Sequence, residues 1–154
     1  HKAIEDDKHN KITNPLYDQA STIQKLKTIQ SELDPTYKDY AIRMIHQMKS
    51  AETLQDDFIE IVENNDLPVI QDIANELQSI QIRLLQDAKS IYRRLVIAEE
   101  ADVIEKKLAD NDKVLKDANK LITEAINYLD VKTPSTEVDL KNLIESLQDL
   151  MKLI

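Results

Sequence analysis

The 154-residue chain contains no glycine, and this absence excludes more than any other feature of its composition. Glycine supplies the positive-φ positions of tight β-hairpins and of most helix C-caps. A β-sandwich or an α/β fold of this length would need such positions repeatedly, whereas an all-α chain can use Asn and Asp at its corners. The lack of glycine therefore favours an all-α fold. It also excludes the glycine-rich loops that bind phosphates and dinucleotides.

Cysteine and tryptophan are absent as well, and aromatic residues make up only 4% of the chain. Without cysteine there is no disulfide framework, no thiol nucleophile and no thiolate metal site. The sequence also lacks a Glu-x-x-His pair, which di-iron helical bundles use to bind their metals. Because none of these signatures occurs, we expect a protein that is not an enzyme and that has no cofactor or resident metal.

Basic residues are too few to balance the acidic ones: 20 Lys and Arg stand against 29 Asp and Glu, a net charge of −9. This balance argues against a nucleic acid partner and against an anionic membrane surface. No apolar run approaches the roughly 18 residues of a membrane span. We therefore expect a protein partner, with a basic one favoured by charge. The lack of cysteine and a first residue that is His1 rather than Met suit an extracellular or cell-surface protein, with the cytoplasm as the alternative.

What the sequence does contain is helical periodicity. Apolar residues, mostly aliphatic, recur at steps of three and four, and no stretch shows a convincing alternation of period two. The prolines mark helix starts, because proline is tolerated in the first turn and each one here follows a good N-cap residue: Pro15, Pro35, Pro68 and Pro134. Residues 1–13 are charged, and we expect a partly frayed tail there. Residues 14–154 then form a helical-bundle domain.

The segment "KLADNDKVLKDANKL", residues 107–121, raises the question of where the chain reverses. The apolar spacing continues through Asp110-Asn111-Asp112, and a helix unbroken from Pro68 to Asp130 would be roughly 95 Å long. Such a rod would need a second chain to cover its apolar stripe. Three consecutive Asp and Asn residues cost about 2 kcal/mol in a helix, and the helix before Pro68 covers the next one only back to about residue 96. We therefore predict a turn at 110–112 in a monomer, with a dimer through a helix continuous at Asn111 as the alternative.

With a turn at 110–112, the sequence predicts an all-α, elongated up-and-down bundle of about five helices. A long central helix, from about residue 67 to 109, is shared by both halves. The domain at 14–154 is then single, or it consists of two fused three-helix bundles that share this helix.

One surface feature stands out, because no Lys or Arg occurs between Ser50 and Ile82. We call its main carboxylates the acidic pole: Glu52, Asp56, Asp57, Glu60, Glu63 and Asp66. Four of them follow at steps of four, four and three, so they share one helix face and repel one another. The last two of these sit near a helix C-terminus, where the helix dipole favours cations. The acidic pole is our candidate for binding a partner, and the alternative is a solvated surface partly neutralised by Lys2, Lys8 and Lys11.

Three functions agree with these observations. The first is a non-enzymatic protein-interaction module, secreted or attached to the cell surface, that binds a protein through its helical faces. The second is a carrier that opens its aliphatic core to a lipid or another apolar ligand. The third is an intracellular helical scaffold or regulator.

Overall fold

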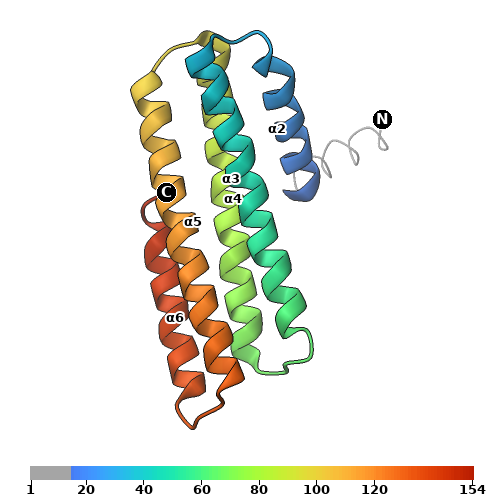
Figure 1. The fold of residues 1–154 in the computed structure, drawn as a ribbon, viewed down its shortest axis with the longest axis vertical. Coiled ribbons are helices and arrows are strands. Elements are labelled where there is room, and N and C mark those ends of the chain that lie inside the picture. Colours follow the sequence, from blue (N-terminus) through green and yellow to red (C-terminus); the bar gives the residue numbers. More distant parts are fainter. Residues whose placement is uncertain (1–14) are drawn as a thin grey trace, which may run out of the picture.

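The computed structural model describes residues 15–154, and this part of the chain is helical without any strand (Figure 1). The helices run alternately up and down in an elongated bundle, so the predicted all-α, up-and-down fold is confirmed. The predicted tail at residues 1–13 lies outside the described residues. The five helices are α2 (Pro15–Gln30), α3 (Pro35–Val62), α4 (Pro68–Ile97), α5 (Ala101–Asp130) and α6 (Thr136–Met151).

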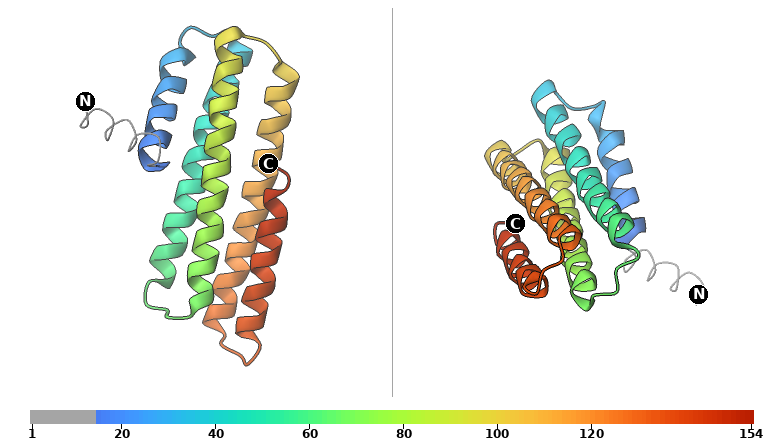
Figure 2. Two further views of the ribbon diagram at one scale, coloured as in Figure 1. Left: turned by 180° about the vertical axis from the view of Figure 1, so that it is seen from behind. Right: turned by 60° about the horizontal axis from the view of Figure 1, so that its bottom comes forward.

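Helices α3, α4 and α5 run the full length of the bundle, and the shorter α2 and α6 cover opposite ends of it (Figures 1 and 2). Helix α2 packs on α3 and α4 in the upper half of Figure 1, and α6 packs on α4 and α5 in the lower half. Helix α4 contacts every other helix. It is therefore central, as predicted, although it ends at Ile97 rather than near residue 109, and α3 and α5 also extend through both halves.

The core consists of two clusters of buried side chains, one in each half of the bundle. Both are mainly aliphatic, and α3, α4 and α5 contribute to both. Burying one large aliphatic or aromatic side chain contributes about 1.5–3 kcal/mol, so these clusters hold the helices together. The lower cluster includes Phe58, Ile73, Leu77, Leu84, Ile122 and Leu147. The upper cluster includes Leu26, Met44, Met48, Ile91, Leu95 and Leu108.

Three of the four helix starts predicted from prolines are confirmed, because helices begin at Pro15, Pro35 and Pro68. Asp34 caps α3, because its carboxylate accepts a hydrogen bond from the backbone N–H of Tyr37 at 3.1 Å. Pro134 lies two residues before the start of α6 instead of in its first turn. There the Thr133 backbone N–H donates to the hydroxyl of Thr136 at 2.9 Å and fixes the entry of the chain into α6.

The predicted turn at 110–112 is wrong, because α5 runs without interruption from Ala101 to Asp130. Asn111 is completely buried, and its Nδ2 donates to Oε1 of Gln47 on α3 at 3.0 Å. The Gln47 amide in turn donates to Asp112 at 2.7 Å. These tertiary hydrogen bonds offset the low helix propensity of the Asp-Asn-Asp sequence. Within the single chain, no helix runs unbroken from Pro68 to Asp130 either, since α4 ends at Ile97.

The chain reverses between α4 and α5 at Ala98–Glu100, where two residues adopt the left-handed region without glycine. Ala98 has φ 52° and Glu100 has φ 60°. The Tyr37 hydroxyl donates to the carbonyl oxygen of Ala98 at 3.1 Å, and Arg94 pairs with Glu100 at 3.4 Å. The left-handed conformation costs an L-residue roughly 1–2 kcal/mol, so this turn is strained.

Candidate functional site

The structure separates the acidic pole into one anchored carboxylate and a group of exposed ones. Glu52 is half-buried and accepts a hydrogen bond from the Gln19 amide of α2 at 2.8 Å. The others are exposed along the last turns of α3 and in the loop to α4. None of the residues of the acidic pole forms an ion pair with any residue in the range 15–154. The lysines predicted to neutralise the pole, Lys2, Lys8 and Lys11, lie outside the described residues.

Two exposed isoleucines lie among these carboxylates, and the sequence reasoning did not single them out. Ile59 is 45% exposed and Ile61 is 58% exposed. They flank Phe58 and Val62, which take the buried positions of α3. A signal was present, because Ile59 and Ile61 fall outside the steps of three and four that mark the core stripe. The end of α3 therefore presents apolar as well as acidic side chains to solvent.

Ile61 lines a groove between the end of α3 and the end of α5, which we call the α3–α5 groove. It encloses about 250 Å³ and is lined by Ile61, Val62, Asn64, Asn65, Ile126, Leu129, Asp130 and Lys132. Asp57 lies one helical turn before Ile61. Neither Asp57 nor Asp130 has an ion-pair partner in the described part of the chain. Small-molecule sites usually begin at about 300 Å³. The α3–α5 groove is therefore smaller than a typical small-molecule site and has room for one or two side chains.

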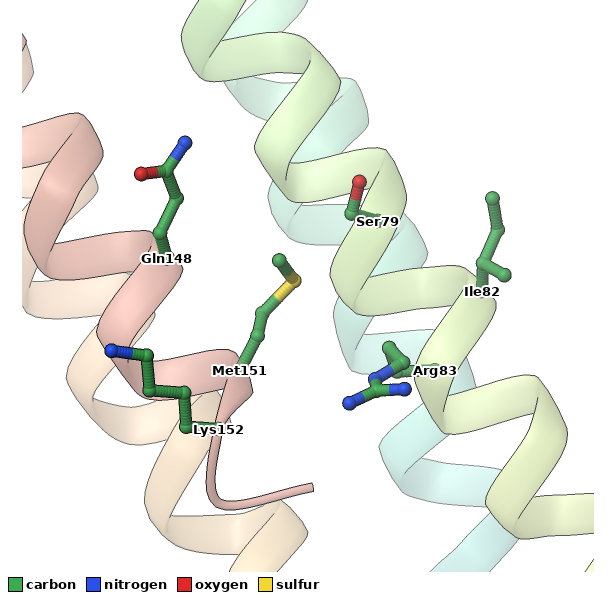
Figure 3. A pocket seen from close by; sticks show the side chains of 6 residues that line it. All are labelled: Ser79, Ile82, Arg83, Gln148, Met151 and Lys152. Carbon is green, nitrogen blue, oxygen red and sulfur yellow. The ribbon is translucent and has the colours of Figure 1, made fainter.

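A second and larger groove, the α4–α6 groove, encloses about 460 Å³ in the lower half of the bundle. Its lining residues are Ser79, Ile82, Arg83, Gln148, Met151 and Lys152. Figure 3 shows the Arg83 guanidinium and the Met151 thioether pointing into the gap between the two helices. Sequence reasoning missed this groove because its two sides lie far apart in the chain.

The charges of the α4–α6 groove are unequally paired. Lys152, which follows the last residue of α6, forms an ion pair with Asp149 at 3.1 Å, and the Gln148 amide donates to Glu76 at 3.0 Å. Arg83 forms no ion pair with a residue of the described range. The groove thus combines an apolar methionine with a guanidinium whose charge also acts on Asp87, one turn further along α4.

One turn further along α4, the carboxyl of Asp87 is largely buried, with 16% of its side chain exposed. Lys107 of α5 approaches it at 3.5 Å. Burial raises the pKa of Asp87 above its ordinary value, and this effect exceeds the opposing influence of Lys107. The charged form of this carboxyl is therefore less stable in the folded protein than in the unfolded chain.

Replacing Asp87 with asparagine should stabilise the protein at neutral pH but not at acidic pH. A raised folded pKa means that the favourable contribution of Asp87 is complete below its unfolded pKa, about 3.9, and is lost as the pH rises through the folded pKa. Asparagine resembles the protonated carboxyl and does not titrate. Urea unfolding should show a higher free energy of unfolding for Asp87→Asn than for the wild type at pH 7, and no difference between the two at pH 3. The exposed Asp72→Asn is the control, and an Asp87→Asn difference independent of pH would contradict this interpretation.

Comparisons with known proteins and a search for metal sites give no further direction. No family model, curated protein or solved structure matches the chain. Across residues 15–154, no group of His, Cys, Asp and Glu side chains is arranged to hold a metal ion. No helix in the same range is long and apolar enough to cross a membrane. The grooves and the charges around them are therefore the features of this molecule that bear on its function.

Proposed function

We propose that the protein is a non-enzymatic interaction module that binds a basic, amphipathic segment of a partner protein at the α3–α5 groove and the acidic pole beside it. The observation that carries this proposal is Ile61, which is more than half exposed in a groove flanked by unpaired carboxylates. An isolated exposed isoleucine is ordinary on a protein surface. Its position in a groove that Asp130 and Lys132 line, with the carboxylates of the acidic pole beside it, is typical of an apolar contact surrounded by a charged rim.

The two parts of this surface would act on different steps of binding. Burial of Ile61 and of the neighbouring apolar lining contributes affinity, at about 25 cal/mol per Å² of apolar area removed from water. The carboxylates of Asp56, Asp57, Glu60 and Glu63 attract a cationic partner and chiefly raise the association rate. An amphipathic helix suits such a surface, because it can present leucines and lysines on adjacent faces.

A defined peptide tests the proposal. The probe is a helical peptide of Leu and Lys, about 14 residues long so that it spans roughly four turns, and the matched probe carries Glu in place of Lys. Calorimetric titration should show binding of the basic peptide alone, and this binding should weaken with added salt. Ile61→Ser should reduce the affinity about tenfold or more, which corresponds to about 1.4 kcal/mol.

The chain offers a closely matched control in Ile97, which is 57% exposed at the opposite end of the bundle. Ile97→Ser removes the same side chain from a site of equal exposure, so it should leave the affinity for the basic peptide unchanged. Substituting Gln or Asn for Asp56, Asp57, Glu60 and Glu63 should slow association and remove most of the salt dependence. Equal effects of Ile61→Ser and Ile97→Ser would show that the peptide binds without using the α3–α5 groove.

The α4–α6 groove supports a second candidate function, a carrier of an amphipathic anion such as a fatty acid. Its volume lies within the range of about 300–1,000 Å³ common for small-molecule sites. Arg83 would bind the carboxylate, and Met151 would contact the alkyl chain, since methionine adapts to irregular apolar ligands. In this form of the carrier hypothesis the ligand lies in a surface groove, and the aliphatic core stays closed.

Dodecanoate is a suitable probe for this second candidate. Arg83→Gln should weaken its binding about tenfold or more, because a charge-assisted hydrogen bond contributes roughly 1.5–3 kcal/mol. The control is Arg93→Gln, which removes another exposed arginine of α4 that lies outside the α4–α6 groove. Titration calorimetry in which both variants bind dodecanoate like the wild type would exclude a carboxylate site at Arg83.

A further inference from the structure

We propose that the turn Ala98–Glu100 is a hinge through which two copies of the chain exchange their α5–α6 segments. In the exchanged dimer, α4 and α5 of each copy join into one continuous helix, and α5 and α6 pack against the α3 and α4 of the other copy. This inference concerns the upper end of the bundle in Figure 1 and is independent of the proposed function.

The first evidence is the conformation of the turn. Ala98 and Glu100 both occupy the left-handed region, which is unfavourable for residues with a Cβ atom. Ala and Glu are also among the residues with high helix propensity. The segment Ala98-Glu99-Glu100 is therefore held in a conformation that its own residues disfavour, and a helical hinge would relieve the strain. Short, strained hinge loops are a recognised cause of exchange between copies.

The second evidence is that the exchange preserves the tertiary contacts of α5 and α6. These helices pack on α3 and α4, and all such contacts can be made by the other copy. They include the hydrogen bond between Asn111 and Gln47 at 3.0 Å and the ion pair between Arg43 and Glu105 at 2.9 Å. The contacts that exist only in the monomer are those of the turn itself. They are the hydrogen bond from the Tyr37 hydroxyl to the Ala98 carbonyl and the ion pair between Arg94 and Glu100.

The third evidence is a pair of apolar side chains beside the hinge. Val96 is 55% exposed and Ile97 is 57% exposed in the monomer. In the exchanged dimer the two hinges lie side by side, because α5 of one copy must begin where α4 of the other copy ends. Val96 and Ile97 would then meet the same residues of the second copy and lose their exposure. Glu99 and Glu100 of both copies would come together there too, so added salt should favour the dimer.

The wild-type protein gives the first test. Refolding from urea at high protein concentration should yield a dimer, seen by size-exclusion chromatography with light scattering, and its fraction should rise with salt. Small-angle scattering of this dimer should show a maximum dimension of at least the roughly 95 Å of a continuous helix over residues 68–130.

Substitutions at the hinge test its cause. Ala98→Gly should raise the dimer dissociation constant about 30-fold, because relief of about 1 kcal/mol in each of two copies equals about 2 kcal/mol at about 1.4 kcal/mol per tenfold change. Glu99→Gly is the matched control, since residue 99 has no positive φ: it places glycine in the helical hinge without relieving strain in the turn, so it should raise the constant clearly less than Ala98→Gly does. Ala98→Val should shift the balance towards the dimer, because a β-branched residue tolerates the left-handed region poorly.

Two results would overturn the proposal. One is a wild-type protein and an Ala98→Val variant that both remain monomeric after refolding at high concentration. The other is a dimer that Ala98→Gly and Glu99→Gly affect equally, or whose maximum dimension is too short for a continuous helix, because such a dimer would not arise from the strained turn.

Discussion

Replacing Phe58 with alanine is expected to lower the free energy of unfolding by about 3–5 kcal/mol, the largest effect of any single substitution considered for this protein. Phe58 is the only phenylalanine in the chain, and its side chain is completely buried in the lower cluster. The loss combines the transfer of a large apolar side chain to water with the cavity left between the helices. A domain is typically stable by only about 5–15 kcal/mol, so the variant should be marginal.

The same experiment tests whether residues 14–154 unfold as one domain or as two fused bundles. Ile91→Ala creates a comparable cavity in the upper cluster. Because α3, α4 and α5 contribute to both clusters, we expect a single urea transition in which both variants lower the midpoint without changing its steepness. The exposed Ile42→Ala should remain within about 0.5 kcal/mol of the wild type. Separate transitions for the two halves, each sensitive to only one of the variants, would support two fused bundles.

The second large effect is expected at the buried pair of Gln47 and Asn111. Gln47 donates to the Leu108 carbonyl at 2.8 Å and accepts from Asn111, whose own Oδ1 has no hydrogen-bond partner in the described structure. Asn111→Ala should destabilise the protein by about 2 kcal/mol, because it leaves the buried Oε1 of Gln47 without a donor. The double variant Gln47→Leu with Asn111→Leu removes the buried amide groups of both side chains. It should therefore be close to the wild type in stability, or above it.

A double-mutant cycle over Gln47 and Asn111 measures this coupling. The stability changes of the two single leucine variants should exceed that of the double variant, with an interaction energy of about 0.5–3 kcal/mol. Additive changes would show that the two amides do not depend on each other. The pair is a buried polar contact between α3 and α5, and such a contact favours one register of two helices over others.

Helix content and helix starts were predictable because they depend on local chemistry. The absence of glycine, the apolar spacing and the prolines at 15, 35 and 68 are all properties of short segments. The position of the reversal was not predictable in this way. Local propensity favoured a break at Asp110–Asp112, whereas Gln47, distant in sequence, stabilises a continuous helix there. Ala98–Glu100 has the composition of a helix, so nothing local indicated a turn.

A length argument did contain the correct information. The helix before Pro68 was expected to cover its neighbour back to about residue 96, and α4 does end at Ile97. The matching lengths of α3 and α4, 28 and 30 residues, follow from packing as an antiparallel pair. This geometric limit outweighs the low helix propensity of three residues, and it agrees with the observed position of the turn.

The candidate site was predictable only in its charge. The acidic pole follows from the lack of Lys and Arg between Ser50 and Ile82, but its relation to Ile61 depends on how α3 is rotated about its axis. The grooves depend on α5 and α6, which bring distant residues to α3 and α4. A surface between helices that are far apart in sequence cannot be seen before their packing is known.

Methyl NMR during titration with the basic Leu and Lys peptide tests the proposed binding surface most directly. The expected result is a set of shift changes at Ile59, Ile61, Ile126 and Val131, at the end of the bundle that carries the acidic pole. Val96 and Ile97, equally exposed at the other end, should keep their positions. Changes centred on Val96 and Ile97, or spread evenly over all exposed methyl groups, would contradict a partner site at the α3–α5 groove.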